Sequence, residues 1–154
     1  MELNKIQYIV CCVPERMDFV DEIKSQIPEL IIVKDKIRNH MDTYKRAMER
    51  SQNKRTIFLE DDIMLTSNFK EKVESVVSQR PNEVIQFFSM RKADLEIGSR
   101  YDNKFIGNLC FYVPDNFTDS YLEYFEKWKR QHPEHPTGSD LAFNDYLKSI
   151  SIDV

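Results

Sequence analysis

Short apolar runs alternate with helix-like segments through the first half of the chain, and this alternation constrains the fold most. The runs 6–13 (IQYIVCCV), 30–33 (LIIV) and 56–59 (TIFL) have the length and composition of strands that are buried in a sheet. Helical apolar spacing and a first-turn proline favour a helix over 14–27, and a polar helix is expected over 43–53. Strands joined by helices form right-handed units with a mostly parallel sheet. The sequence therefore predicts an α/β fold.

The second half of the chain continues with the same two patterns. Three residues are expected to cap helices, namely Asp42, Asn68 (with Glu71 three residues later) and Ser139. The aromatic stripe of the helix expected near the end is interpreted as core packing rather than as a base-stacking platform. The remaining candidates are strands over 84–90, 105–113 and 150–154, and helices over 69–77, 115–130 and 140–149.

Length and composition favour one globular domain. The chain of 154 residues is long enough for a single domain over 1–154, with 41% hydrophobic and 31% charged residues. The abrupt end on ISIDV leaves two interpretations open, a trimmed C-terminus or an unusually compact protein. A net charge of −4 gives no general attraction to nucleic acid or anionic membrane, although a local basic groove can sit on an acidic protein.

Cysteine usage and the N-terminal sequence favour a cytoplasmic protein. Cys11, Cys12 and Cys110 form no CxxC motif, and two of them lie in an apolar run, so buried free thiols are expected. Free thiols suit a reducing cytoplasm. The N-terminal apolar run is too short to cross a bilayer and lacks a cleavage site, so we expect neither a signal peptide nor a transmembrane segment.

Three adjacent carboxylates follow the third apolar run directly. Glu60, Asp61 and Asp62 repel one another, so solvent, a basic neighbour or a metal ion must offset their charge. Ligands of open α/β sheets bind at the carboxyl ends of strands, and Mg²⁺ or Mn²⁺ prefers oxygen ligands. The position therefore suits a metal–diphosphate site. The simpler interpretation is a solvated turn before a capped helix.

The segment IFLEDDIMLTSNF resembles the acidic DxD-type motif of GT-A glycosyltransferases, and is closest to that of bacterial lipooligosaccharide-type (family 25-like) small transferases. YIVCCVPERMDFVDEI is similar to their opening strand, whose turn meets the nucleotide. HPTGSDLAFNDYLKSISIDV is similar to a late segment in which an aspartate opens a helix beneath the acceptor site. The resemblance implies a single-domain, Rossmann-like GT-A three-layer sandwich. It also implies transfer of a sugar from a nucleotide donor, most simply a UDP-sugar, to a hydroxyl acceptor with Mn²⁺ or Mg²⁺.

The resemblance assigns roles to the acidic motif and to the late aspartate. Asp62 and Glu60 are the expected metal ligands, and Asp61 is expected to contact the nucleotide sugar. Asp140 is expected to act as the general base that deprotonates an acceptor hydroxyl in an inverting transfer. The alternative for Asp140 is a purely electrostatic role at a helix N-terminus.

Further residues are expected to contact the donor and acceptor. Pro14, Arg16 and Asp35 follow the first two strands and are candidates for nucleotide-sugar binding. Arg91 and Lys92 are candidates for binding an anionic acceptor. A glycan, a lipopolysaccharide sugar and a modified DNA base are all compatible acceptors.

Two other functions stay open. Members of the resembled family are usually longer, with an acceptor-binding half and a closing C-terminal loop, so a degenerate domain that binds a nucleotide or partner without turnover is one alternative. A metal-dependent nuclease or phosphohydrolase is the other. That activity would need a further acid and a catalytic lysine on neighbouring strands, and no convincing pattern of this kind is found.

Overall fold

The computed structural model describes residues 5–88 and 98–151 of the chain. The strands are β1 (Gln7–Cys12), β2 (Ile31–Lys34), β3 (Thr56–Glu60), β4 (Ile85–Gln86) and β5 (Cys110–Val113). The helices are the short 3₁₀ helix η1 (Pro14–Arg16), α1 (Met17–Gln26), α2 (His40–Arg50), α3 (Phe69–Gln79), α5 (Thr118–Gln131) and α6 (Ser139–Ser149). This order confirms the predicted α/β class.

The strands form one mixed open sheet in the order β2-β1-β3-β5-β4. β1 pairs in parallel with both β2 and β3, whereas β5 is antiparallel to β3 and to β4. Because only β5 runs against the others, the sheet of the described chain is mostly parallel, as predicted. The register pairs Cys11 with Glu60 and Cys12 with Lys34, so the carboxyl ends of β1, β2 and β3 meet at one edge.

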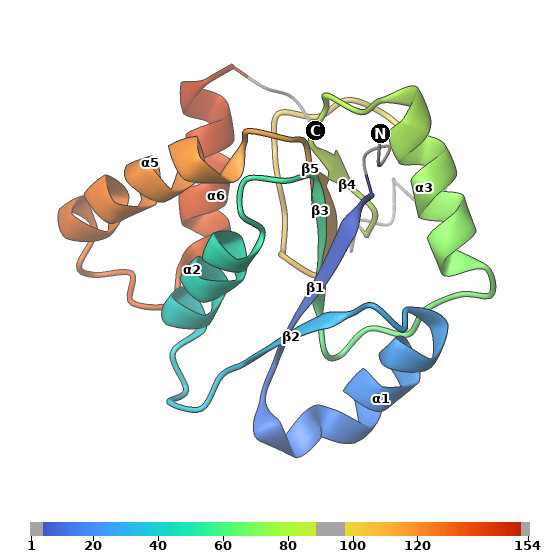
Figure 1. The fold of residues 1–154 in the computed structure, drawn as a ribbon. Coiled ribbons are helices and arrows are strands. Elements are labelled where there is room, and N and C mark those ends of the chain that lie inside the picture. Colours follow the sequence, from blue (N-terminus) through green and yellow to red (C-terminus); the bar gives the residue numbers. More distant parts are fainter. Residues whose placement is uncertain (1–4, 89–97, 152–154) are drawn as a thin grey trace.

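Helices cover both faces of the sheet, which gives three layers (Figure 1). Alternate residues of β1 enter opposite cores, because successive strand side chains point to opposite faces. Tyr8 and Val10 pack with α1 and α3, and Ile9 and Cys11 pack with α2, α5 and α6. Burial on both faces explains why the β1 sequence is continuously apolar. The aromatic stripe of α5 belongs to the second core, as expected.

Several predicted helix starts need correction. Asn39, rather than Asp42, caps α2, since its side-chain oxygen accepts a hydrogen bond from the Asp42 N–H. Asn68 precedes α3 with a φ of 57°, and its side chain makes no capping bond. Ser139 is the first residue of α6 and Gly138 occupies the cap position, so the Ser139 hydroxyl is available for a tertiary contact.

The later strands are shorter than their apolar runs. Within the described residues the run 84–90 contributes only β4, and the run 105–113 contributes only its last four residues as β5. Ile150 is the C-terminal cap of α6 and Ser151 lies in a turn, so the strand expected from 150 is wrong at these two positions. Residues 152–154 lie outside the described part of the chain.

Candidate functional site

The candidate site lies at the carboxyl edge of β1, β2 and β3. The chain leaves β1 toward β2 on one side, then crosses back through α2 to β3 on the other side, so the gap between β1 and β3 is a topological switch point. Ligands of open α/β sheets bind at such points. β5 begins at the same edge because it runs antiparallel to β3. The predicted residues found on segments at this edge are Pro14, Arg16, Asp35, Glu60, Asp61, Asp62 and Asp140.

Asp61 connects the end of β3 to the turn after β1 by hydrogen bonds. Its carboxylate accepts a hydrogen bond of 2.8 Å from the Val13 N–H and one of 2.9 Å from the Arg16 guanidinium. Asp61 is only 3% exposed, whereas the Arg16 side chain is 46% exposed. The hydrogen bond to Asp61 raises the pKa of Arg16. A basic neighbour therefore offsets the buried member of the acidic motif.

Asp62 points to a more open environment than Asp61. Its side chain is 51% exposed, and its one contact within the described chain is an ion pair of 3.5 Å with Arg16. The Asp62 carboxylate is thus available to a ligand, while both oxygens of Asp61 are already occupied. Pro14 begins the turn that presents Arg16, since it opens η1 directly after β1.

Glu60 belongs to a hydrogen-bonded network of side chains that the sequence did not predict. His40, the first residue of α2, lies with Nε2 3.1 Å from Glu60 Oε1 and with Nδ1 2.8 Å from Ser139 Oγ. The Asn108 amide donates to Ser139 Oγ over 2.9 Å. This hydrogen-bonded network therefore joins the end of β3, the starts of α2 and α6, and the segment before β5.

An ionised Glu60 carboxylate can only accept hydrogen bonds, so His40 Nε2–H donates to it. Nδ1 of the neutral ring then accepts from the Ser139 hydroxyl, whose oxygen also accepts from Asn108 Nδ2–H. Tyr44 holds the backbone of this segment, because its hydroxyl donates to the Asn108 carbonyl over 2.7 Å. Asn108 Oδ1 is buried and has no partner among the described residues.

His40 is an electrostatic link between the two acidic parts of the site. The hydrogen bond that His40 donates to Glu60 raises the pKa of His40, burial opposes this effect, and the charge of Asp140 acts in the same direction as Glu60. Asp140 is half-buried, and its Oδ1 accepts a hydrogen bond from the Leu141 N–H. Asp140 directly follows Ser139, which contacts His40, so Asp140 lies on the His40 side of this edge, although no hydrogen bond joins the two within the described residues.

Asp35 stabilises the loop that leads from β2 to His40 at the start of α2. It is 7% exposed, its N–H donates to the Cys12 carbonyl over 2.7 Å, and its carboxylate accepts from the Asn39 N–H. Asn39 in turn caps α2, so Asp35 organises the start of that helix. Arg91 and Lys92 lie outside the described residues.

The divalent cation implied by the resemblance would rely mainly on Asp62. No group of three His, Cys, Asp or Glu side chains arranged for a metal ion is found in the part of the chain that the structure describes. Asp61 is fully engaged, and one Glu60 oxygen is bonded to His40. An open carboxylate at Asp62, with Glu60 beside it in sequence, fits a cation that takes its other oxygens from substrate phosphates and water.

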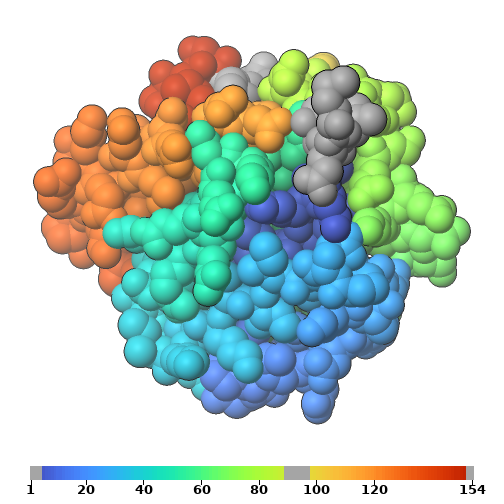
Figure 2. All heavy atoms as spheres, viewed as in Figure 1, coloured from blue at the N-terminus to red at the C-terminus, as the bar shows by residue number. Residues whose placement is uncertain are grey.

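A cavity lies at the opposite edge of the sheet. Its volume is about 1010 Å³, and its lining includes the starts of β1 and β2. Figure 2 shows the dark-blue atoms near the chain's N-terminus in a hollow beside the green α3. The charged groups of the lining are largely paired with one another, as in Arg55–Asp115 and Lys70–Glu29. This edge therefore offers less chemistry than the carboxyl edge.

The sequence matches no known family model, and no curated protein is significantly similar to it. Among the described helices, none combines the length and the apolar composition that crossing a bilayer requires.

Proposed function

We propose that the protein is a metal-dependent glycosyltransferase that moves a sugar from a nucleotide diphosphate donor to a hydroxyl acceptor. The observation that carries this proposal is the meeting of Arg16, Asp61 and Asp62 at the switch point between β1 and β3. A guanidinium can bind a phosphate of the donor, and an exposed carboxylate beside it can bind the divalent cation that accompanies this phosphate. The resemblance of the LEDD segment to the GT-A motif supports the same assignment.

In this proposal the two acids after β3 have different tasks. Asp61 holds the nucleotide-facing turn, with Pro14, Arg16 and Asp35 contributing to the donor pocket. Asp62, with Glu60, holds Mn²⁺ or Mg²⁺, which when bound would neutralise charge on the departing diphosphate. UDP-sugars are the first donors to test.

The acceptor side of the proposal rests on Asp140. Its half-buried carboxylate at the start of α6 follows Ser139, which contacts His40, and it can take the proton of an acceptor hydroxyl. A glycan or a modified DNA base can supply that hydroxyl. The three buried thiols suit a reducing compartment such as the cytoplasm, where nucleotide sugars would be the donor supply.

Thermal unfolding with nucleoside diphosphates, with and without Mn²⁺, tests the proposal. A ligand at about 100 times its Kd adds about 2.7 kcal/mol, which raises the Tm of a chain of this size by roughly 5–10 °C. We expect UDP to produce this shift only when Mn²⁺ is present. Asp62→Ala should abolish the shift, while Asp21→Ala, an exposed acid on α1, should retain it.

Transfer is measured separately from binding. Asp140→Asn should keep the metal-dependent shift and lose sugar transfer, because it removes a base without touching the donor pocket. No shift with any nucleotide, together with cleavage of DNA in Mg²⁺, would favour the phosphohydrolase alternative. A shift without transfer to any acceptor would favour a domain that binds nucleotide without turnover.

A further inference from the structure

Cations from two elements line a groove between the edge strand β2 and α2. The groove has a volume of about 530 Å³, and its charged lining is Lys34, Lys36, Arg46 and Arg50 against the single acid Glu49. Lys34 and Lys36 flank the buried Asp35 at the end of β2. Arg46 and Arg50 are one helical turn apart on α2. The groove is therefore strongly basic, although the chain as a whole carries a net charge of −4.

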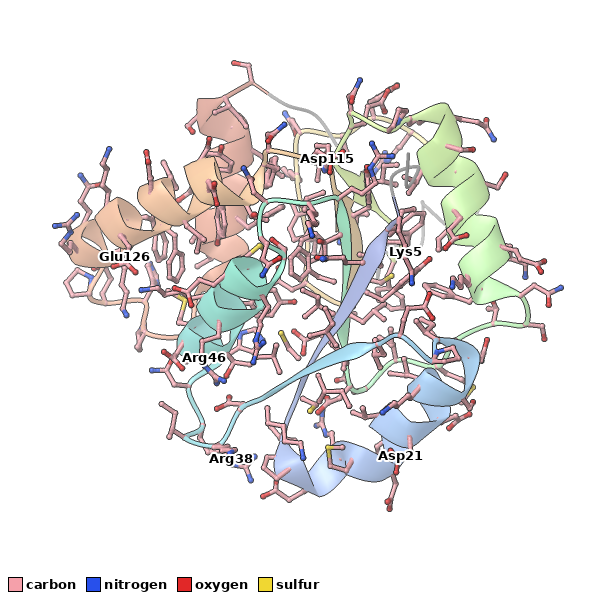
Figure 3. The ribbon with its side chains drawn as sticks, in the orientation of Figure 1. Lys5, Asp21, Arg38, Arg46, Asp115 and Glu126 are labelled. Carbon is pink, nitrogen blue, oxygen red and sulfur yellow. The ribbon has the colours of Figure 1, made fainter. Side chains whose placement is uncertain are left out.

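Arg46 is fixed in place, unlike a freely solvated surface arginine. Its Nε donates to Asp42 over 2.9 Å, and its Nη2 donates to the Lys34 carbonyl over 3.0 Å and to Thr43 Oγ1 over 3.1 Å. Figure 3 shows Arg46 between α2 and the edge of the sheet, and Arg38 on the loop below it. A pre-organised guanidinium loses little freedom when it binds an anion.

The other cations of the groove are not neutralised by the protein. Lys34, Lys36 and Arg50 form no ion pair with any residue in the ranges 5–88 and 98–151. Lys45, which neighbours Arg46, instead pairs with Glu126 on α5. The unpaired charge therefore gathers in the groove between β2 and α2.

An exposed apolar side chain lies beside these cations. Ile37 is 68% exposed, and in the loop between β2 and α2 it follows Lys36 and precedes Arg38, whose guanidinium pairs with Glu15. The blue and cyan atoms of α1, β2 and this loop form a continuous surface along the lower part of Figure 2. Cations that surround an exposed aliphatic side chain suit the interface of an anionic bilayer, which offers phosphate charge and an apolar layer together.

We propose that the groove and the loop Lys36–Arg38 dock on an anionic lipid bilayer. The cations contact lipid phosphates and Ile37 enters the acyl boundary. Nucleic acid fits less well. For a single strand, the groove lining has no aromatic side chain on which bases can stack, and for a duplex, the phosphate backbone gives Ile37 no apolar partner.

Docking in this way has a consequence for the candidate site. The loop lies between Asp35 and His40 at the carboxyl edge, so the bilayer would face the edge that holds Glu60 and Asp62. An acceptor hydroxyl presented at a lipid surface would then be within reach of the site. This consequence rests on the proposed transferase function, whereas the docking itself does not.

Cosedimentation with lipid vesicles tests the proposal. We expect binding to vesicles of phosphatidylcholine mixed with phosphatidylglycerol, none to phosphatidylcholine alone, and a decline as NaCl is raised. Each lost cation should weaken binding about fivefold. The triple variant Lys34→Gln, Lys36→Gln, Arg50→Gln should therefore lose about a hundredfold, and Ile37→Ser should weaken binding at every salt concentration.

Matched controls separate the groove from net charge and general hydrophobicity. Lys127→Gln, Lys129→Gln, Arg130→Gln removes the same charge from exposed positions on α5, and Val76→Ser removes an exposed apolar residue from α3. Both controls should bind vesicles like the unmodified protein. Equal losses in the groove and control variants would overturn the proposal.

Two further outcomes also overturn it. One is failure of the unmodified protein to bind anionic vesicles, and the other is tighter, groove-dependent binding to a DNA duplex than to vesicles. The UDP and Mn²⁺ thermal shift is measured on the same variants. A retained shift with no vesicle binding refutes docking alone, and vesicle binding with no shift refutes the transferase assignment alone.

Discussion

Ser139 Oγ lies 2.8 Å from His40 Nδ1, although 99 residues separate the two positions in the sequence. The contact fixes the start of α6 against the start of α2, beside the acidic motif that follows β3. Ser139 Oγ also accepts a hydrogen bond from the Asn108 amide, and His40 Nε2 faces the Glu60 carboxylate, which can only accept when it is ionised. Glu60 thus favours a proton on Nε2 and leaves Nδ1 of the neutral ring to accept from Ser139.

We predict which tautomer the neutral ring of His40 adopts. At a pH above its pKa, the neutral ring should carry its proton on Nε2, where Glu60 accepts it. Nitrogen-15 NMR correlations of the histidine ring distinguish the two tautomers directly. A neutral ring protonated on Nδ1 would contradict the direction of the hydrogen-bond chain.

Loss of the Ser139 hydroxyl should lower the stability of the protein. Ser139→Ala leaves the Asn108 amide and His40 Nδ1 without their partner, which should cost about 1–3 kcal/mol in the free energy of unfolding. Ser149→Ala, at the exposed end of the same helix, should change it by less than about 0.5 kcal/mol. Urea unfolding of both variants makes the comparison, and equal effects would remove the special role of Ser139.

The neighbouring acids Asp61 and Asp62 should differ sharply in their effect on stability. Asp61→Ala removes the buried acceptor of the Val13 N–H and of Arg16, so we expect a loss of about 2–4 kcal/mol. Asp62→Ala removes one exposed, loosely held ion pair and should cost less than about 0.5 kcal/mol. Urea unfolding without metal or nucleotide measures both. A large cost at Asp62 would mean that it is a structural residue.

The layered fold was largely predictable, because it follows from local patterns. The continuous apolar run of β1 predicts burial on both faces, and the alternation with helices predicts parallel neighbours. Strand lengths were less predictable. An apolar run such as 105–113 does not reveal where pairing begins, and only its last four residues pair as β5.

The candidate site was predictable only where it follows the strands in sequence. Repulsion within the acidic motif predicted that solvent, a basic neighbour or a metal ion would offset its charge, and for Asp61 the basic neighbour Arg16 does so. His40 and Asn108 carry no motif, and their contacts depend on how α6 and β5 return to the same edge. The prediction that Ser139 caps the last helix is also wrong, because its hydroxyl makes this tertiary contact instead of capping its own helix.

The ion pair between Glu29 and Lys70 should make stability depend on pH. The hydrogen bond from Lys70 lowers the pKa of Glu29, so the folded protein gains stability from the ionised carboxylate. This gain is present above the ordinary pKa of glutamate and is lost as the pH falls through the lowered value. Glu29→Gln should therefore cost up to about 1 kcal/mol at pH 7, and the difference should vanish in acid. Glu22→Gln, an exposed glutamate on α1, is the control.

The three cysteines should be unreactive in the folded protein. Burial raises the pKa of Cys110 to about 12 and also raises the pKa values of Cys11 and Cys12. Since the thiolate is the reactive form, iodoacetamide at pH 8 should label none of them until the chain unfolds. Mass spectrometry should count no adducts on the native protein and three after denaturation in urea. Rapid modification of the native protein at Cys110 would show that the sheet beside β3 opens far more readily than its burial implies.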